Sequence, residues 1–180
     1  MRNLLKPVEG DRGDPDPEVR RLVAAARRSR SDYLDAVVSL CTARLLMPVM
    51  APQDRLSPTP AAPQPSHPSA GSAGDQTHEM APEVNELGAV VLTHPDGTTA
   101  LLCFTGADAM GEWDARARPV PGHLDDLAAT VDEAGAQVLL IDVAGPVPMV
   151  IGPDLIAQLS AGRRLVKLDD GGYGWMSVAR

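Results

Sequence analysis

The chain has 180 residues and a formal net charge of −8, which leaves room for one domain with tails and not for two. An acidic balance speaks against nucleic-acid binding, because affinity for phosphate backbones comes largely from basic groups. The two cysteines have no CxxC spacing, and no apolar run approaches the ~20 residues that a membrane span needs. We therefore expect a cytoplasmic protein with reduced thiols that contacts neither nucleic acid nor membrane.

The N-terminal part predicts a tail, two helices and a strand. Charged residues, proline and glycine predict a flexible tail over residues 1–16, and Asp16 followed by Pro17 is typical of a helix start. Apolar side chains then recur three and four residues apart, as they do on one face of a helix. The expected elements are helices from 17 and over about 32–42, and a strand over 44–50 that Pro48 would confine to a sheet edge.

Residues 51–86 form the sharpest compositional break in the chain. They contain seven prolines and are otherwise rich in Ala, Ser, Gln and Gly, so they cannot bury enough apolar surface to offset their ordering entropy. Two helices and one strand could not form a core alone, so the strand before this break must join the sheet that follows it. We predict a single domain over 17–168 that contains a disordered insertion over 51–86, which chain entropy tolerates.

After the insertion the pattern is that of a mixed sheet with helices. The nearly continuous apolar run 137–142 is typical of a central strand buried on both faces. Thr105 is expected to cap the helix that follows it, and Trp113 to lie on the buried side of that helix. The other expected elements are a hairpin turning at 94–97, an extended piece at 118–121, helices over 123–134 and from 153, and strands at 147–151 and 165–168. The fold class is α/β, a mixed sheet flanked by helices, with a tail over 169–180.

Asp142 is the sharpest candidate for chemistry. It ends an apolar strand, which is where α/β enzymes hold metals or phosphoryl groups. The alternative is that Asp142 hydrogen-bonds the turn at 143–146, as Asp commonly does. The turn interpretation is favoured, because no phosphate loop precedes Asp142 and no second acidic cluster follows it in helical register.

The other reactive residue types form no catalytic pattern. Cys41 and Cys103 lie in apolar surroundings, where cysteine packs as a small hydrophobe. The histidines have neither the i, i+4 nor the HxH spacing of a metal site; they are His67, His78, His94 and His123. The glycine-rich run 171–174 does not open a helix as a phosphate loop would. We expect no catalytic residue, no cofactor and no metal.

Five arginines lie within eleven residues of the N-terminal region: Arg20, Arg21, Arg27, Arg28 and Arg30. A charge run on an amphipathic helix is usually its solvated face. The alternative is an electrostatic docking surface for an acidic partner. Arg20 and Arg27 are the candidate contact residues of that surface.

Five short blocks of the chain occur in the order in which similar blocks occur in a known family; they are 43–50, 90–97, 100–105, 113–121 and 138–146. On these blocks the stretch 43–151 resembles the N-terminal domain of the SseB family, in the single-domain form found in high-GC bacteria. Val143 departs from the family's "LDPAGP" pattern, which has a proline there. The resemblance implies an α/β domain and little chemistry, because the family is named after a serine-sensitivity phenotype and has no established reaction.

The preferred interpretation is a non-catalytic interaction or regulatory module that binds another protein. The alternative is a small-molecule binder or enzyme linked to amino-acid (serine) metabolism, with Asp142 near its site. A deep pocket lined by Asp142 would favour the alternative, and a shallow apolar patch the interaction module. The candidate residues are Asp142, Trp113, Arg20 and Arg27.

Overall fold

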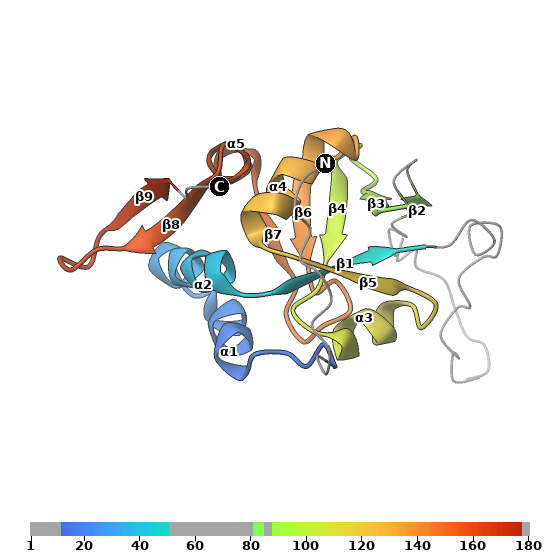
Figure 1. Ribbon diagram of the computed structural model, residues 1–180, viewed down its shortest axis with the longest axis horizontal. Coiled ribbons are helices and arrows are strands. Elements are labelled where there is room, and N and C mark those ends of the chain that lie inside the picture. Colours follow the sequence, from blue (N-terminus) through green and yellow to red (C-terminus); the bar gives the residue numbers. More distant parts are fainter. Residues whose placement is uncertain (1–11, 51–80, 85–87, 178–180) are drawn as a thin grey trace, which may run out of the picture.

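The computed structural model describes residues 12–50, 81–84 and 88–177. At its centre is a mixed sheet of five strands in the order β2-β3-β4-β6-β7 (Figure 1). These strands are β2 (Ala81–Val84), β3 (Val90–Thr93), β4 (Thr99–Cys103), β6 (Val138–Ile141) and β7 (Met149–Ile151). Strands β4 and β6 run parallel, and the other neighbours run antiparallel. The predicted mixed α/β class is confirmed.

Two antiparallel ribbons flank this sheet. Strand β1 (Leu45–Val49) pairs with β5 (Arg118–Gly122), and β8 (Arg163–Lys167) pairs with β9 (Tyr173–Ser177). Leu46 joins the first ribbon to the main sheet by exchanging both backbone hydrogen bonds with Phe104, at 2.8 Å each. Pro48 stands opposite Pro119, so this pair contains no N–H that could donate to the ladder.

Five helices pack on the strands within the described residues. They are α1 (Pro17–Ala25), α2 (Arg30–Thr42), α3 (Ala107–Trp113), α4 (Leu124–Glu133) and α5 (Pro153–Ser160). The Asp16 carboxylate accepts from the backbone N–H groups of Glu18 and Val19, which confirms the predicted start of α1. Helix α2 begins two residues earlier than predicted, because the Ser29 hydroxyl accepts from the Asp32 N–H at 3.0 Å.

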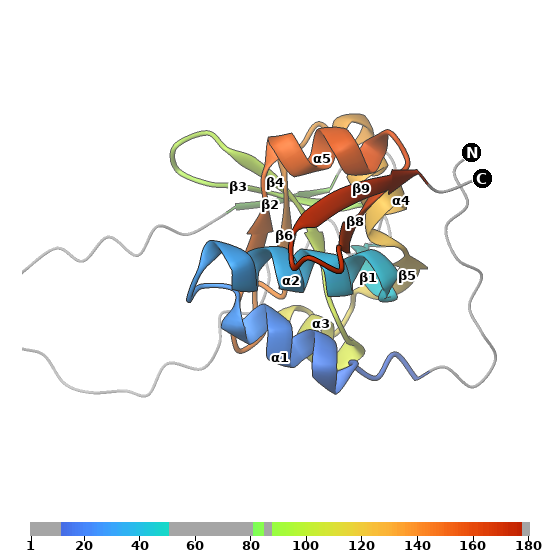
Figure 2. The ribbon, with the colours of Figure 1, turned by 90° about the vertical axis from the view of Figure 1, so that its left-hand side faces the viewer.

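The sheet separates two hydrophobic cores. Alternate side chains of a strand point to opposite faces. Both faces of β4 and β6 are buried, as we predicted for β6. One face packs against α1, α2, α4 and α5; its residues on the two central strands are Leu101, Cys103, Leu139 and Ile141. The other packs against α3; its residues on these strands are Ala100, Leu102 and Leu140, and Phe104 joins them directly after β4. Figure 2 shows α5, α2 and α1 one below the other in front of the sheet.

Three predicted boundaries differ from the structure. Residues 81–84, which we assigned to the disordered insertion, pair with β3. Residues 173–177, which we assigned to a tail, pair with β8. In the N-terminal tail, the Gly13 carbonyl accepts from the Ala107 N–H at 2.8 Å, so this segment is fixed against α3. Within the predicted tails and insertion, residues 1–11, 51–80, 85–86 and 178–180 lie outside the described part of the chain.

Chain segments on the two sides of residues 51–80 meet in one core. Strand β1 pairs with β5, and Val37 and Leu40 of α2 are fully buried in the core that includes α4 and α5. We therefore expect that a protease site engineered within 55–80 can be cut without separating the fragments. After cleavage the two pieces should co-elute on gel filtration at the volume of the uncut chain. Elution as two separate species would contradict the shared core.

Candidate functional site

Asp142 directly follows β6 and is 2% exposed. Its backbone has a φ of 52°, in the left-handed region that Asp tolerates better than most residues. The Asp142 carbonyl accepts from the Gly145 N–H at 2.8 Å, which closes a tight turn. A Cβ at Gly145 would lie 2.7 Å from the Asp142 Cβ, so this turn requires glycine.

The Asp142 carboxylate binds Thr105 and not the turn. Its Oδ1 accepts from the Thr105 N–H at 2.8 Å, and its Oδ2 accepts from the Thr105 hydroxyl at 2.6 Å. Thr105 follows β4, and the carboxyl ends of parallel strands meet at one edge of a sheet, so β4 and β6 bring the two residues together. Asp142 does hydrogen-bond the turn at 143–146, but through its backbone carbonyl, while its carboxylate binds Thr105.

Thr105 does not cap α3 as predicted. The N-cap residue is Gly106, which offers no side-chain acceptor. A Cβ at Gly106 would lie 2.8 Å from the Cβ of Pro15, because the N-terminal segment crosses closely here. The Thr105 hydroxyl is instead committed to Asp142 and to Arg20, whose Nε donates to it at 3.0 Å.

Arg20 connects α1 to the start of α3. Its Nη1 and Nη2 donate to Oδ2 and Oδ1 of Asp108 at 2.6 and 2.7 Å, a bidentate pair. The result is a continuous chain of polar contacts that we call the Arg20 network: Asp108, Arg20, Thr105 and Asp142. The hydrogen bonds from Arg20 lower the pKa of Asp108. Burial raises the pKa of Asp142, and the bonds from Thr105 oppose that rise.

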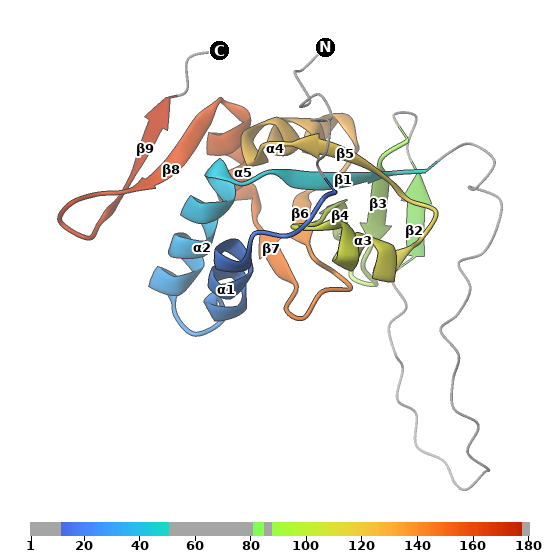
Figure 3. The ribbon, with the colours of Figure 1, turned by 60° about the horizontal axis from the view of Figure 1, so that its bottom comes forward.

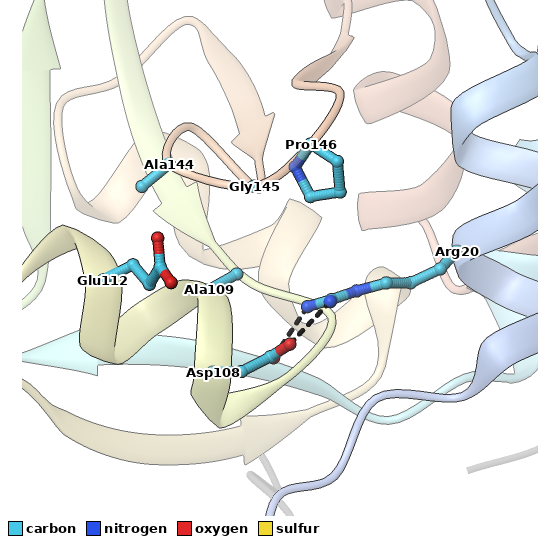
Figure 4. A pocket seen from close by; sticks show the side chains of 7 residues that line it. All are labelled: Arg20, Asp108, Ala109, Glu112, Ala144, Gly145 and Pro146. Carbon is cyan, nitrogen blue, oxygen red and sulfur yellow. Dashed lines mark hydrogen bonds and ion pairs between the residues drawn. The ribbon is translucent and has the colours of Figure 1, made fainter.

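An open cleft of about 400 Å³ lies beside the Arg20 network (Figure 4). It is lined by Arg20, Asp108, Ala109, Glu112, Ala144, Gly145 and Pro146. Asp142 does not line this cleft. It adjoins a separate space of about 10 Å³, which is too small for more than a water molecule.

The Thr105 hydroxyl could act as a nucleophile, with the Asp142 carboxylate as its base, only if a substrate reached them. Thr105 is 3% exposed, and both Asp142 oxygens already accept hydrogen bonds from it. A general base must lie within hydrogen-bonding reach of the proton that it removes. This geometry suits a buried link between strands better than a catalytic pair.

The structure brings two of the four candidate residues together. Arg20 and Asp142 both bind the Thr105 hydroxyl. Trp113 lies apart on α3, where its ring centroid is 5.9 Å from that of Phe104. Arg27 is exposed, and its Nη2 donates to the Pro148 carbonyl at 3.4 Å. The roles of Thr105 and Asp108 were not predicted, because both residues are far in the chain from their partners.

The remaining reactive side chains of the described residues form no second site. Cys41 and Cys103 are free and buried, and desolvation raises the pKa of both thiols. No group of three His, Cys, Asp or Glu residues in the described ranges is placed to hold a metal ion. Nor does any helix among these residues have the length and apolar character to cross a membrane.

Fold and site together define a mixed α/β domain whose buried carboxylate belongs to an internal polar network. The chain belongs to the SseB family, since the model of the SseB protein N-terminal domain matches residues 19–158. This confirms the resemblance to the SseB N-terminal domain. Strand β1, the five-stranded sheet and most of α5 lie within the matched part. No curated protein and no solved structure matches the chain.

Proposed function

We propose that this SseB-domain protein is a non-catalytic module that binds an acidic segment of a partner protein. The observation that carries the proposal is an exposed group of arginines where α1 gives way to α2, here called the basic turn: Arg27 and Arg28 between the helices and Arg30 at the start of α2. None of the three has an ion-pair partner among the described residues. Their charges are therefore available to a partner.

An apolar side chain adjoins the basic turn. Val150 of β7 is 49% exposed, and the Tyr33 hydroxyl of α2 donates to its carbonyl at 2.9 Å. Arg27, in the turn between the two helices, donates to the nearby Pro148 carbonyl. Basic and apolar groups thus share one surface, which suits an acidic peptide that also carries an apolar residue.

The charge distribution of the chain supports an acidic partner. Residues 1–50 carry nine basic and seven acidic groups, whereas residues 87–180 carry six basic and twelve acidic groups. An acidic protein would be repelled by most of this surface and attracted at the basic turn, which orients the encounter. Arg20 takes no part, because Asp108 and Thr105 occupy its donors.

Charge reversal of the basic turn tests the proposal. We expect the triple variant Arg27→Glu, Arg28→Glu, Arg30→Glu to capture about tenfold less of the partner from native lysate at low salt. Three exposed charges that each contribute roughly 0.5 kcal/mol account for a loss of this size. The measurement is affinity co-purification with quantitative mass spectrometry, in which the protein that is depleted from the variant identifies the partner.

Two control variants separate charge from fold. The triple Lys variant at the same positions keeps the charge and should keep the capture. Arg118→Glu reverses an exposed arginine on β5 and should also keep it. If the triple Glu variant captures the same proteins in the same amounts as the wild type, the basic turn is only a solvated face.

The alternative function is a small-molecule binder or enzyme linked to amino-acid metabolism, acting at the 400 Å³ cleft. Its support is Glu112, whose carboxylate lines the cleft and has no ion-pair partner among the described residues. The pairing of Arg20 with Asp108 weakens it, because these two charges already neutralise each other. A rise in Tm with free L-serine that Glu112→Gln abolishes would favour this alternative.

We also propose that the described residues form one domain of the high-GC bacterial type, in a reducing compartment such as the cytoplasm. The use of fourteen arginines and two lysines supports the lineage. The pairing of β1 with β5 supports the single domain, and two free buried thiols support the compartment.

A further inference from the structure

We propose that two copies of this chain associate through β9, the outer strand of the β8–β9 hairpin. The two β9 strands pair antiparallel about a two-fold axis, so that the hairpins form one four-stranded sheet. This surface is distinct from the basic turn, and the proposal does not depend on the proposed function.

The hairpin is the most apolar exposed part of the described chain. Its strands extend from the body beyond α2 and α5 (Figures 1 and 3). Large apolar side chains with substantial exposure are Val150 at 49%, Leu168 at 45%, Trp175 at 38% and Met176 at 53%, and all but the first belong to the hairpin. The inner strand is anchored by Leu165, which is 4% exposed. A partner therefore has apolar surface to cover on the outer strand and at Leu168 in the turn that precedes it.

The free edge of β9 carries none of the features that keep sheet edges apart. Exposed edges are usually protected by charged side chains or proline. Strand β9 reads Tyr-Gly-Trp-Met-Ser and has neither. The main sheet differs at both of its edges: Tyr33 donates to the Val150 carbonyl of β7, and β2 carries Pro82 and Glu83. Among the described strands only β8 pairs with β9.

Antiparallel pairing centred on Trp175 gives a complementary set of neighbours. Each Trp175 then stands beside Trp175 of the other copy, as a cross-strand aromatic pair. Met176 of one strand stands beside Gly174 of the other, over which the apolar side chain of Leu168 of that copy lies. A two-fold interface of this kind is self-complementary and closed, so the assembly stops at two copies.

Charge favours the antiparallel direction. The turn between β8 and β9 carries Asp169 and Asp170, and Arg163 lies at the opposite end of the hairpin. Antiparallel pairing places the acidic turn of each copy at the Arg163 end of the other, whereas parallel pairing would place like charges side by side. Arg163 binds the neutral Gln158 amide, and none of these three charges has an ion-pair partner within the described part of the chain.

Sedimentation analysis of the full chain tests the proposal. A five-residue ladder corresponds to a small interface, so we expect a dissociation constant on the order of 10 µM. Between about 1 and 200 µM, the weight-average mass should rise from 18.9 kDa toward twice that value. We expect Trp175→Lys and, separately, Met176→Lys to weaken association at least tenfold. Val150→Lys is the matched control on β7 and should leave association unchanged.

A charge swap tests the direction of pairing. Asp169→Arg and Arg163→Asp should each weaken association about threefold, and the double variant should restore it, because the opposite charges meet again between copies. Circular dichroism of each variant verifies that it is folded. A wild type that stays monomeric to 200 µM, or one whose association survives both lysine variants, would overturn the proposal. Reversal of the basic turn should leave the dimer intact, which separates this result from the partner-binding experiment.

Discussion

Replacement of Phe104 by alanine is expected to lower the free energy of unfolding by about 3–5 kcal/mol. Phe104 is fully buried and belongs to the core on the α3 side of the sheet. Its ring lies against Trp113, and its backbone holds Leu46 of β1 through two hydrogen bonds. Removal of the ring leaves a cavity at the junction between the main sheet and the β1–β5 ribbon.

Urea denaturation followed by circular dichroism measures this loss. Phe104→Leu is the matched control; it keeps most of the volume and should cost less than half as much. The fluorescence of Trp113 provides a second measurement in a Trp175→Phe background, because the indole should become more hydrated when Phe104 is truncated. A loss below about 1 kcal/mol would mean that the core on this face is loosely packed.

Asp142→Ala is expected to cost about 2–3 kcal/mol of stability. The Thr105 N–H and hydroxyl are buried and donate to the Asp142 carboxylate, so the substitution leaves both without that acceptor. Glu112→Gln removes the same charge from an exposed position in the cleft and should cost less than about 0.5 kcal/mol. Equal losses in the two variants would contradict a structural role for the Arg20 network.

Asp142→Asn should lower the stability less than Asp142→Ala does, and by an amount that depends on pH. Burial raises the pKa of Asp142 in the folded protein above its value in the unfolded chain. Its contribution to stability is therefore fully present below the unfolded pKa and declines as pH rises through the folded pKa. The Asn variant lacks this decline, so its deficit relative to the wild type should shrink between pH 4 and pH 7. A deficit that grows over this range would contradict the raised pKa.

The sequence predicted those elements whose signals are local. The start of α1 follows from Asp16 and Pro17, and the burial of β6 on both faces follows from its unbroken apolar run. Strands β2 and β9 were not predicted. Proline and glutamate interrupt the apolar pattern of β2, and glycine interrupts that of β9. Both strands are held by backbone pairing to a neighbour, which local propensity does not report.

The site was predicted only in part, for a related reason. Asp142 was conspicuous because a carboxylate ends an apolar run, and Arg20 because it belongs to an arginine cluster. What joins them is Thr105, which we expected to cap a helix. The contacts of the network cross between α1, the end of β4 and the end of β6, and this closeness arises only once the parallel pairing of β4 and β6 is formed.

The β1–β5 ribbon also constrains the order in which the chain can fold. The β3–β4 hairpin closes through a short turn. Pairing of Leu46 with Pro121, by contrast, joins residues that are separated by all of the intervening chain. Closure of a flexible loop becomes harder by about 0.6 kcal/mol for each doubling of its length. The ribbon therefore closes late, after the local pairs, and the length of the segment between residues 50 and 81 sets the rate of that last step more than it sets the stability of the finished domain.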